Sequence, residues 1–186
     1  MKENERTPQE LSVSIANLLT ESVRRGREYG KNDPQVLLFS KEEAAIFEET
    51  GQELVKQDYQ LMDVNECAGI SPEDDLISAK EAGFAAPESV KINDLQMSDE
   101  EKRRYITRVK LNRLLSQVND RSILIVKYND LYTRGGRLYE TVRTWLKDGY
   151  SHTDGFPSVV ALVLVEKEEG IQDFCQYGSW ATDLLR

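Results

Sequence analysis

Two runs of consecutive apolar residues constrain the fold more than any other part of this sequence. Residues 159–165 are VVALVLV, and residues 122–128 (SILIVKY) contain the four consecutive aliphatic residues ILIV. A strand with one face in water alternates apolar and polar side chains, whereas a strand buried on both faces is apolar throughout. Both runs therefore predict strands of a sheet that is covered on both faces. A third strand is predicted over residues 171–177 (IQDFCQY), after a turn at 166–170.

An amphipathic helix is predicted between the first two strands, over residues 137–147. Its apolar side chains fall on one arc of a helix: Leu138, Tyr139, Val142, Trp145 and Leu146. If the two strands are adjacent and parallel, this helix forms a right-handed crossover. We therefore expect an α/β or α+β fold, with a small three-stranded sheet at about 122–128, 158–166 and 171–177 and helices covering it.

The N-terminal half carries repeated helix-start signals. Thr7, Ser40 and Ser71 each precede an acidic residue three positions later, which is the pattern of a capping box. These starts predict helices over residues 8–29, from 41 to about 62, and over 71–83, with a break near Gly51 as the alternative for the second helix. Residues 35–39 (QVLLF) predict a short strand, and residues 84–97 a connecting segment.

The predicted organisation is thus a frayed terminus at 1–7, an acidic and mainly helical region at 8–97, and an α/β region at 98–186. A chain of 186 residues is expected to form one compact domain overall.

Charge is distributed unevenly along the chain. The net charge is −9, but residues 1–100 sum to −12, residues 101–147 to +8 and residues 148–186 to −5. A basic segment in an acidic chain either pairs with the acidic residues of the same chain or binds an anion from outside. We keep both alternatives open, with the internal pairing ahead because the whole protein is acidic.

The basic segment begins with a predicted helix over residues 98–118, whose start is marked by the capping signal Ser98 to Glu101. Its apolar residues do not share one face: Tyr105, Ile106 and Val109 lie nearly opposite Leu111, Leu114 and Leu115. A helix of this kind either contacts two different partners or bends. Nucleic acid requires cations that neutralise phosphates, and the candidate contacts are Arg103, Arg104, Arg108, Lys110, Arg113, Arg143 and Lys147.

The order of predicted elements after residue 98 is compatible with a winged helix. In that interpretation residues 137–147 form the recognition helix and residues 166–170 the tip of the wing. Two features argue against it: the strand at 159–165 is apolar on both faces, and the tip (EKEEG) is acidic, which phosphates would repel.

The segment 127–137 is the predicted functional edge. It follows the carboxyl end of a strand and leads into a helix N-terminus, where ligands of open α/β sheets bind. Its candidate residues for an anion or a partner are Lys127, Asn129, Asp130, Tyr132, Arg134, Gly135, Gly136 and Arg137. The spacing matches neither a P-loop nor a GxGxxG motif, so an ordinary surface turn is the competing interpretation.

A catalytic set of carboxylates is a weaker hypothesis. Metal-dependent nucleases gather carboxylates and a lysine around a divalent cation, and the candidates are Asp130, Glu140, Asp154 and Glu166 with Lys127 and Lys167. Charged residues at the ends of strands are common, however. We therefore assign no catalytic residue, no metal ligand and no cofactor.

The remaining composition favours a reduced, cytoplasmic protein. The two cysteines fit neither a metal site nor a disulfide framework, the first residues lack the apolar core of a secretory signal, and no apolar run can span a membrane. We expect a non-enzymatic intracellular binding or regulatory protein that acts through contacts with an unidentified protein. The alternatives are a nucleic-acid-binding protein that uses residues 101–147 and, less favoured, a metal-dependent hydrolase or nuclease.

Overall fold

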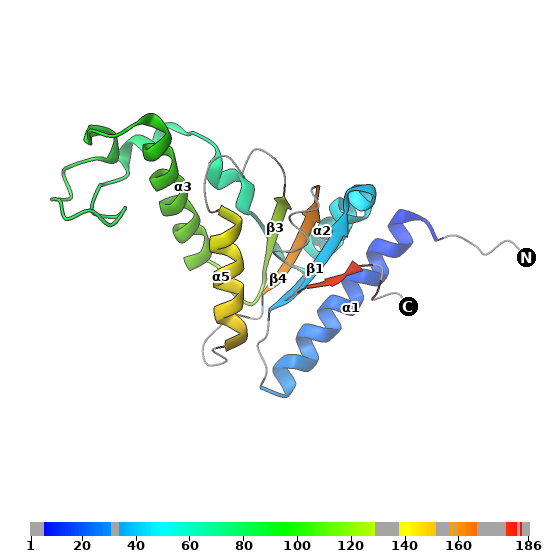
Figure 1. Cartoon of the computed structure of the whole chain (residues 1–186). Helices are drawn as coiled ribbons and strands as arrows, with labels where there is room; N and C mark the ends of the chain where they lie inside the picture. Colours follow the sequence, from blue (N-terminus) through cyan, green and yellow to red (C-terminus); the bar gives the residue numbers. More distant parts are fainter. Residues whose placement is uncertain are drawn as a thin grey trace, which may run out of the picture.

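The protein is an α/β structure built on a five-stranded sheet in which every strand pair is parallel (Figure 1). The computed structural model describes residues 6–30, 34–128, 138–151, 157, 159–166, 178–181 and 183. The strands are β1 (Gln35–Ser40), β2 (Gln60–Asp63), β3 (Ser122–Tyr128), β4 (Val160–Val165) and β5 (Gly178–Trp180). They are arranged in the order β2-β3-β4-β1-β5.

Within the described residues, four α-helices accompany the sheet: α1 (Pro8–Glu28), α2 (Ala44–Lys56), α3 (Asp99–Ser116) and α5 (Leu138–Ser151). Shorter 3-10 helices are η1 (Lys41–Glu43), η2 (Val64–Ala68), η3 (Pro72–Leu76) and η4 (Ile92–Asp94). The capping boxes at Thr7 and Ser98 form as predicted, since each side chain and the glutamate three residues later exchange hydrogen bonds with the backbone.

The sheet is buried on both faces, as its apolar strands predict. One face is covered by α1 and α2. Their residues Ile15, Leu19, Phe47 and Leu54 pack against every second residue of β1, β3 and β4. On the other face α3 and α5 contribute Leu111, Leu115, Leu138, Val142 and Leu146. All six residues of β4 are buried. The run VVALVLV is therefore apolar because it forms the centre of a three-layer structure.

The crossovers follow one consistent hand. The connections β2–α3–β3 and β3–α5–β4 step in one direction across one face, while β1–α2–β2 steps in the opposite direction across the other face. A crossover that steps in the opposite direction across the opposite face has the same hand. The three crossovers therefore share one hand, in line with the strong right-handed preference of parallel crossovers. The condition set for the crossover through α5 is met, because β3 and β4 are adjacent and parallel.

The predicted number of strands is wrong. We expected three strands and a mainly helical N-terminal half, whereas the sheet has five strands. Residues 8–97 supply β1 and β2, so the acidic half contributes strands to the sheet as well as helices to one face. The short strand predicted at 35–39 is confirmed as β1. The strand predicted at 171–177 lies outside the described residues, and the fifth strand that is described follows it directly.

The long helix predicted from 41 to about 62 is shorter than expected. It ends at Lys56, and the chain turns at Asp58, whose φ of 66° lies in the left-handed region, before it enters β2. The helix predicted over 71–83 is also corrected. Ser71 does begin η3, but Ile77 and Ala79 then form backbone hydrogen bonds with Ile92 and Val90, in an extended pairing that no helix permits.

Residues 69–97 form a structural unit that we call the projection. It lies at the N-terminal end of α3, away from the sheet, where Figure 1 shows it in teal and green. A small core of Ile77, Ala82 and Ile92 packs on Val109 of α3. The two apolar faces of α3 therefore have two different partners, the projection and the sheet, and the first of the two alternatives for this helix is confirmed.

Candidate functional site

The carboxyl ends of all strands meet at one edge of the sheet because the strands are parallel, and ligands of such sheets bind at this edge. The turn from β1 into α2 is not built for phosphate. The backbone N–H of Ser40 donates to Glu43 Oε2 at 2.7 Å, and Glu42 adds a second carboxylate. A phosphate-binding loop offers free backbone N–H groups and glycine, whereas this turn presents carboxylates that would repel an anion.

The end of β3 is fixed by the side chain of Asn65. Asn65 Oδ1 accepts from the Lys127 N–H at 2.8 Å, and Asn65 Nδ2 donates to the Lys127 carbonyl at 2.7 Å. The hydroxyl of Tyr139 donates to the same carbonyl, and its ring stacks on Tyr128 with centroids 4.3 Å apart. Asn65 therefore replaces a strand neighbour where β2 has ended, and Tyr139 holds the start of α5 against β3.

Most of the predicted loop 127–137 cannot be compared with the structure. Lys127 is described, whereas Asn129, Asp130, Tyr132, Arg134, Gly135, Gly136 and Arg137 lie outside the described residues, as does Asp154. Among the predicted carboxylates, Glu166 is described and exposed just beyond β4.

A pocket of about 260 Å³ opens beside Lys127, between α2 and the carboxyl ends of β2 and β3. Its apolar part is formed by Phe47, Leu61 and Ile125. Its polar lining consists of Glu48, Gln52, Asp63, Glu66 and Lys127. Gly51 completes the wall on the α2 side. We call this the edge pocket.

Lys127 is a structural cation in this pocket. Its Nζ lies 2.7 Å from Glu48 Oε1 and 5.9 Å from the centre of the Phe47 ring. The hydrogen bond to Glu48 raises the pKa of Lys127 above its ordinary value, and Asp63 and Glu166 act in the same direction. A lysine that serves as a base needs a lowered pKa, so Lys127 is suited to charge pairing and not to proton abstraction.

Cys67 is equally unsuited to chemistry. It is a buried residue of η2, and burial raises the pKa of its thiol to about 11. The reactive form of cysteine is the thiolate, which this environment disfavours. Cys67 therefore acts as a small apolar side chain of the core.

Replacing Gly51 should stabilise the protein. A Cβ at this position would meet Leu61 Cδ2 at 3.7 Å and Ile125 Cδ1 at 3.9 Å, both ordinary contacts. Glycine within a helix costs about 1 kcal/mol relative to alanine. We expect Gly51→Ala to raise the melting temperature by about 2–4 °C for a chain of this size. Thermal unfolding followed by circular dichroism tests this, and a lower melting temperature would show that the backbone at this position requires glycine.

The cations of α3 are largely engaged within the chain. Arg113 makes two hydrogen bonds of 2.6 Å to Glu81, and Lys110 Nζ lies 3.3 Å from Asp74 and donates to the Gly69 carbonyl. Arg108 donates to the Ala82 carbonyl and lies over the Tyr105 ring. These three side chains attach the projection to the helix.

Other cations predicted to contact nucleic acid are distributed over two helices. Arg104 pairs with Glu100 one turn earlier on α3, whereas Arg103 is exposed and forms no ion pair with the described residues. Arg143 and Lys147 lie on α5. The charge distribution favoured pairing of the basic segment with acidic residues of the same chain. Lys110 and Arg113, two of the cations that hold the projection, are paired in this way.

The projection displays two aliphatic side chains in an acidic frame. Ile70 and Leu76 are 75% and 71% exposed, more than any other large aliphatic residue in the described parts. Residues 69–97 hold six acidic and two basic side chains. Asp74 lies between the two aliphatic residues in the sequence. It accepts a hydrogen bond from the Ser71 N–H at 2.8 Å and pairs with Lys110 of α3, so these contacts fix the turn that carries Ile70 and Leu76.

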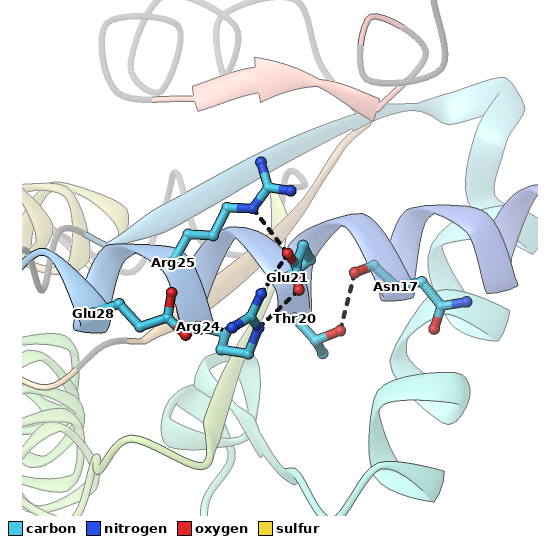
Figure 2. Close-up of polar contacts among 6 residues, drawn as sticks. All are labelled: Asn17, Thr20, Glu21, Arg24, Arg25 and Glu28. Carbon is cyan, nitrogen blue, oxygen red and sulfur yellow. Dashed lines mark hydrogen bonds and ion pairs between the residues drawn. The ribbon is translucent and has the colours of Figure 1, made fainter.

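The exposed face of α1 is neutralised by its own side chains. Arg24 and Arg25 both pair with Glu21, at 2.7 and 2.8 Å, and Arg24 also pairs with Glu28 (Figure 2). This face therefore presents balanced charge, in contrast to the acidic projection.

Glu21 should titrate at unusually low pH. Its hydrogen bonds to Arg24 and Arg25 lower the pKa of its carboxyl from 4.5 to about 2. Because the pKa is lowered, any stabilisation from this cluster is present above the ordinary value and is lost as the pH falls toward 2. An NMR titration of the carboxyl carbon should give this midpoint, and Arg25→Gln should raise it. A midpoint at the ordinary value in the unaltered protein would contradict the arrangement in Figure 2.

No group of three or more His, Cys, Asp or Glu side chains within the described ranges could hold a metal ion. None of the helices in those ranges is both long and apolar enough to cross a bilayer. Comparison with known proteins gives no match to any family model, any curated protein or any solved structure.

Proposed function

We propose that this protein is a binding protein that recognises a protein partner through the projection. The observation that carries the proposal is the exposure of Ile70 and Leu76 on a turn that is fixed by Lys110 and Asp74. Two large aliphatic side chains in water gain nothing for the folded monomer, whereas at an interface they become buried. The free thiol of Cys67 is compatible with a cytoplasmic protein, which we include in the proposal.

The rigidity of the turn favours binding. Side chains that are ordered before a partner arrives lose less conformational entropy on association. Asp74 is only 6% exposed in its side chain, and Lys110 19%, so this ion pair is more sheltered than the surface pairs of α1. Asn93 adds a hydrogen bond of 2.6 Å to Asp75 on the same turn.

The charge of the projection specifies the partner. Glu73 and Asp75 are exposed beside Leu76, and the unit as a whole has an excess of acidic residues. Complementary potentials accelerate encounter and exclude partners of like charge. The partner surface is therefore an apolar groove with a basic rim.

Binding to nucleic acid through α3 is less well supported. It requires cations that face solvent together, yet Arg108, Lys110 and Arg113 are directed into contacts with the projection. No observation favours a hydrolase, since Lys127 is paired with Glu48 and the other carboxylate and lysine candidates, apart from Glu166, have no described side chain.

Site-specific photocrosslinking tests the proposal. A benzophenone amino acid is placed at Leu76 and, as the control, at Tyr29, which is 80% exposed on a different part of the molecule. In cells that produce the protein, position 76 should yield a discrete protein adduct that position 29 does not. The crosslinked peptide should be basic, and Ile70→Ser in the same chain should reduce the yield. An acidic peptide, a nucleic-acid adduct, or the same adducts from both positions would overturn the proposal.

A further inference from the structure

The described lining of the edge pocket carries an excess of negative charge. Among the described residues, three carboxylates line it, on Glu48, Asp63 and Glu66, against one ammonium group, that of Lys127. Lys127 pairs with Glu48. Asp63 accepts one backbone hydrogen bond from Asn65, and within the described residues neither Asp63 nor Glu66 forms an ion pair.

Gly51, in the α2 wall of the pocket, leaves the space above the apolar floor unfilled. Its position needs no glycine for packing, because a Cβ would fit in ordinary contact with Leu61 and Ile125. Its φ is not among the positive values of the described residues, so the backbone does not require glycine either. A buried helical glycine costs stability relative to alanine. The space above Leu61 and Ile125 is what the glycine provides.

The size and lining of the space define its occupant. A volume of about 260 Å³ is below the usual range for nucleotides and cofactors but is adequate for one amino-acid side chain. The apolar floor accommodates an alkyl stem, while the Phe47 ring faces the ammonium group of Lys127. Asp63 and Glu66 can accept hydrogen bonds from a cationic head group.

We infer that the edge pocket binds an organic cation, an alkyl ammonium or alkyl guanidinium group that places its stem on Leu61 and Ile125 and its head between Asp63 and Glu66. The group comes either from a lysine or arginine side chain of another protein or from a free amine. This site lies on α2, β2, β3 and η2, whereas the projection is formed by residues 69–97, so the inference does not rest on the proposed docking of the projection.

An NMR titration of the whole protein tests the inference. The probes are n-butylammonium and n-butylguanidinium as free cations and N-acetylarginine amide as the protein-borne form. Butyramide and butyrate are the neutral and anionic controls of similar size. The amide signals of Gly51, Asp63 and Lys127 should shift and saturate with the cations and not with the controls. Saturation with N-acetylarginine amide assigns a protein side chain as the source, and saturation with the free cations alone assigns a small amine.

Two variants with separate consequences complete the test. Gly51→Leu fills the pocket and should abolish the shifts. Asp63→Asn with Glu66→Gln keeps the shape and the helix cap of η2, and should weaken binding by about tenfold or more, because two charge-assisted hydrogen bonds are lost. Circular dichroism confirms that both variants fold. The inference is overturned if the cations produce no saturable shift, if butyramide shifts the same amides equally, or if the doubly substituted protein binds the cations unchanged.

Discussion

Phe39→Ala should destabilise the protein by about 3–5 kcal/mol, the usual cost of removing a fully buried aromatic ring. Phe39 lies in β1, between β4 and β5, and is 0% exposed. Its ring meets that of Phe47 edge to face at 5.5 Å, so the substitution leaves a cavity between the sheet and α2. We expect the melting temperature to fall by roughly 6–20 °C.

Urea and thermal unfolding measure this loss. Phe39→Leu retains most of the volume and should cost much less, and Tyr29→Ala, on the surface, should change stability by no more than about 0.5 kcal/mol. If Phe39→Ala were as mild as Tyr29→Ala, β1 would not be a central strand, and the sheet order would be wrong.

Asp74→Ala should open the projection while leaving the sheet folded. The substitution removes the capping box at Ser71 and leaves Lys110 without its carboxylate. Together these losses correspond to about 2–4 kcal/mol, toward the lower end because Lys110 reaches water. The cost falls on a unit whose own core is small, so local opening is expected before global unfolding.

Hydrogen exchange detects this opening. The amides of Ala79 and Ile92, which bond to the Val90 and Ile77 carbonyls, should exchange at least about tenfold faster, while amides of β3 and β4 should not change. Glu88→Ala is the matched control, because its pair with Lys80 is exposed on the same unit and contributes little. Equal exchange in the two variants would show that the Lys110 to Asp74 contact does not hold the projection.

The elements that the sequence predicts well are those whose signals are local. The capping residues Thr7 and Ser98 mark helix starts that form, and the apolar runs mark β3 and β4. Strand β2 is missed because its four residues continue the apparent helical period of α2, and the break depends on the left-handed backbone of Asp58. The capping box at Ser71 correctly predicts where a helical turn begins but not where it ends. The helix stops at Leu76 because residues 77–79 form backbone hydrogen bonds with residues 90–92 instead.

The candidate sites depend on neighbours that no local pattern specifies. Lys127 is predicted as a site residue, but Glu48 and Asp63 reach it only because β2 lies beside β3 and α2 crosses above them. Gly51 within a helical pattern is the one local sign of the edge pocket. The charge distribution predicts that the basic helix pairs with the acidic half, whereas the particular partners Asp74 and Glu81 follow from the projection folding back on α3.

The most direct test compares two labelled probes by fluorescence anisotropy at low salt: a helical peptide of lysine and leucine, and a DNA duplex. We predict saturable binding of the peptide that Ile70→Ser with Leu76→Ser reduces without changing the charge, while Val13→Ser with Val55→Ser, at exposed positions on α1 and α2, has no effect. We predict no binding of the duplex. Duplex binding that weakens steeply with salt and is reduced by Arg113→Ala would contradict us, because the cations of α3 would then serve nucleic acid and not the projection.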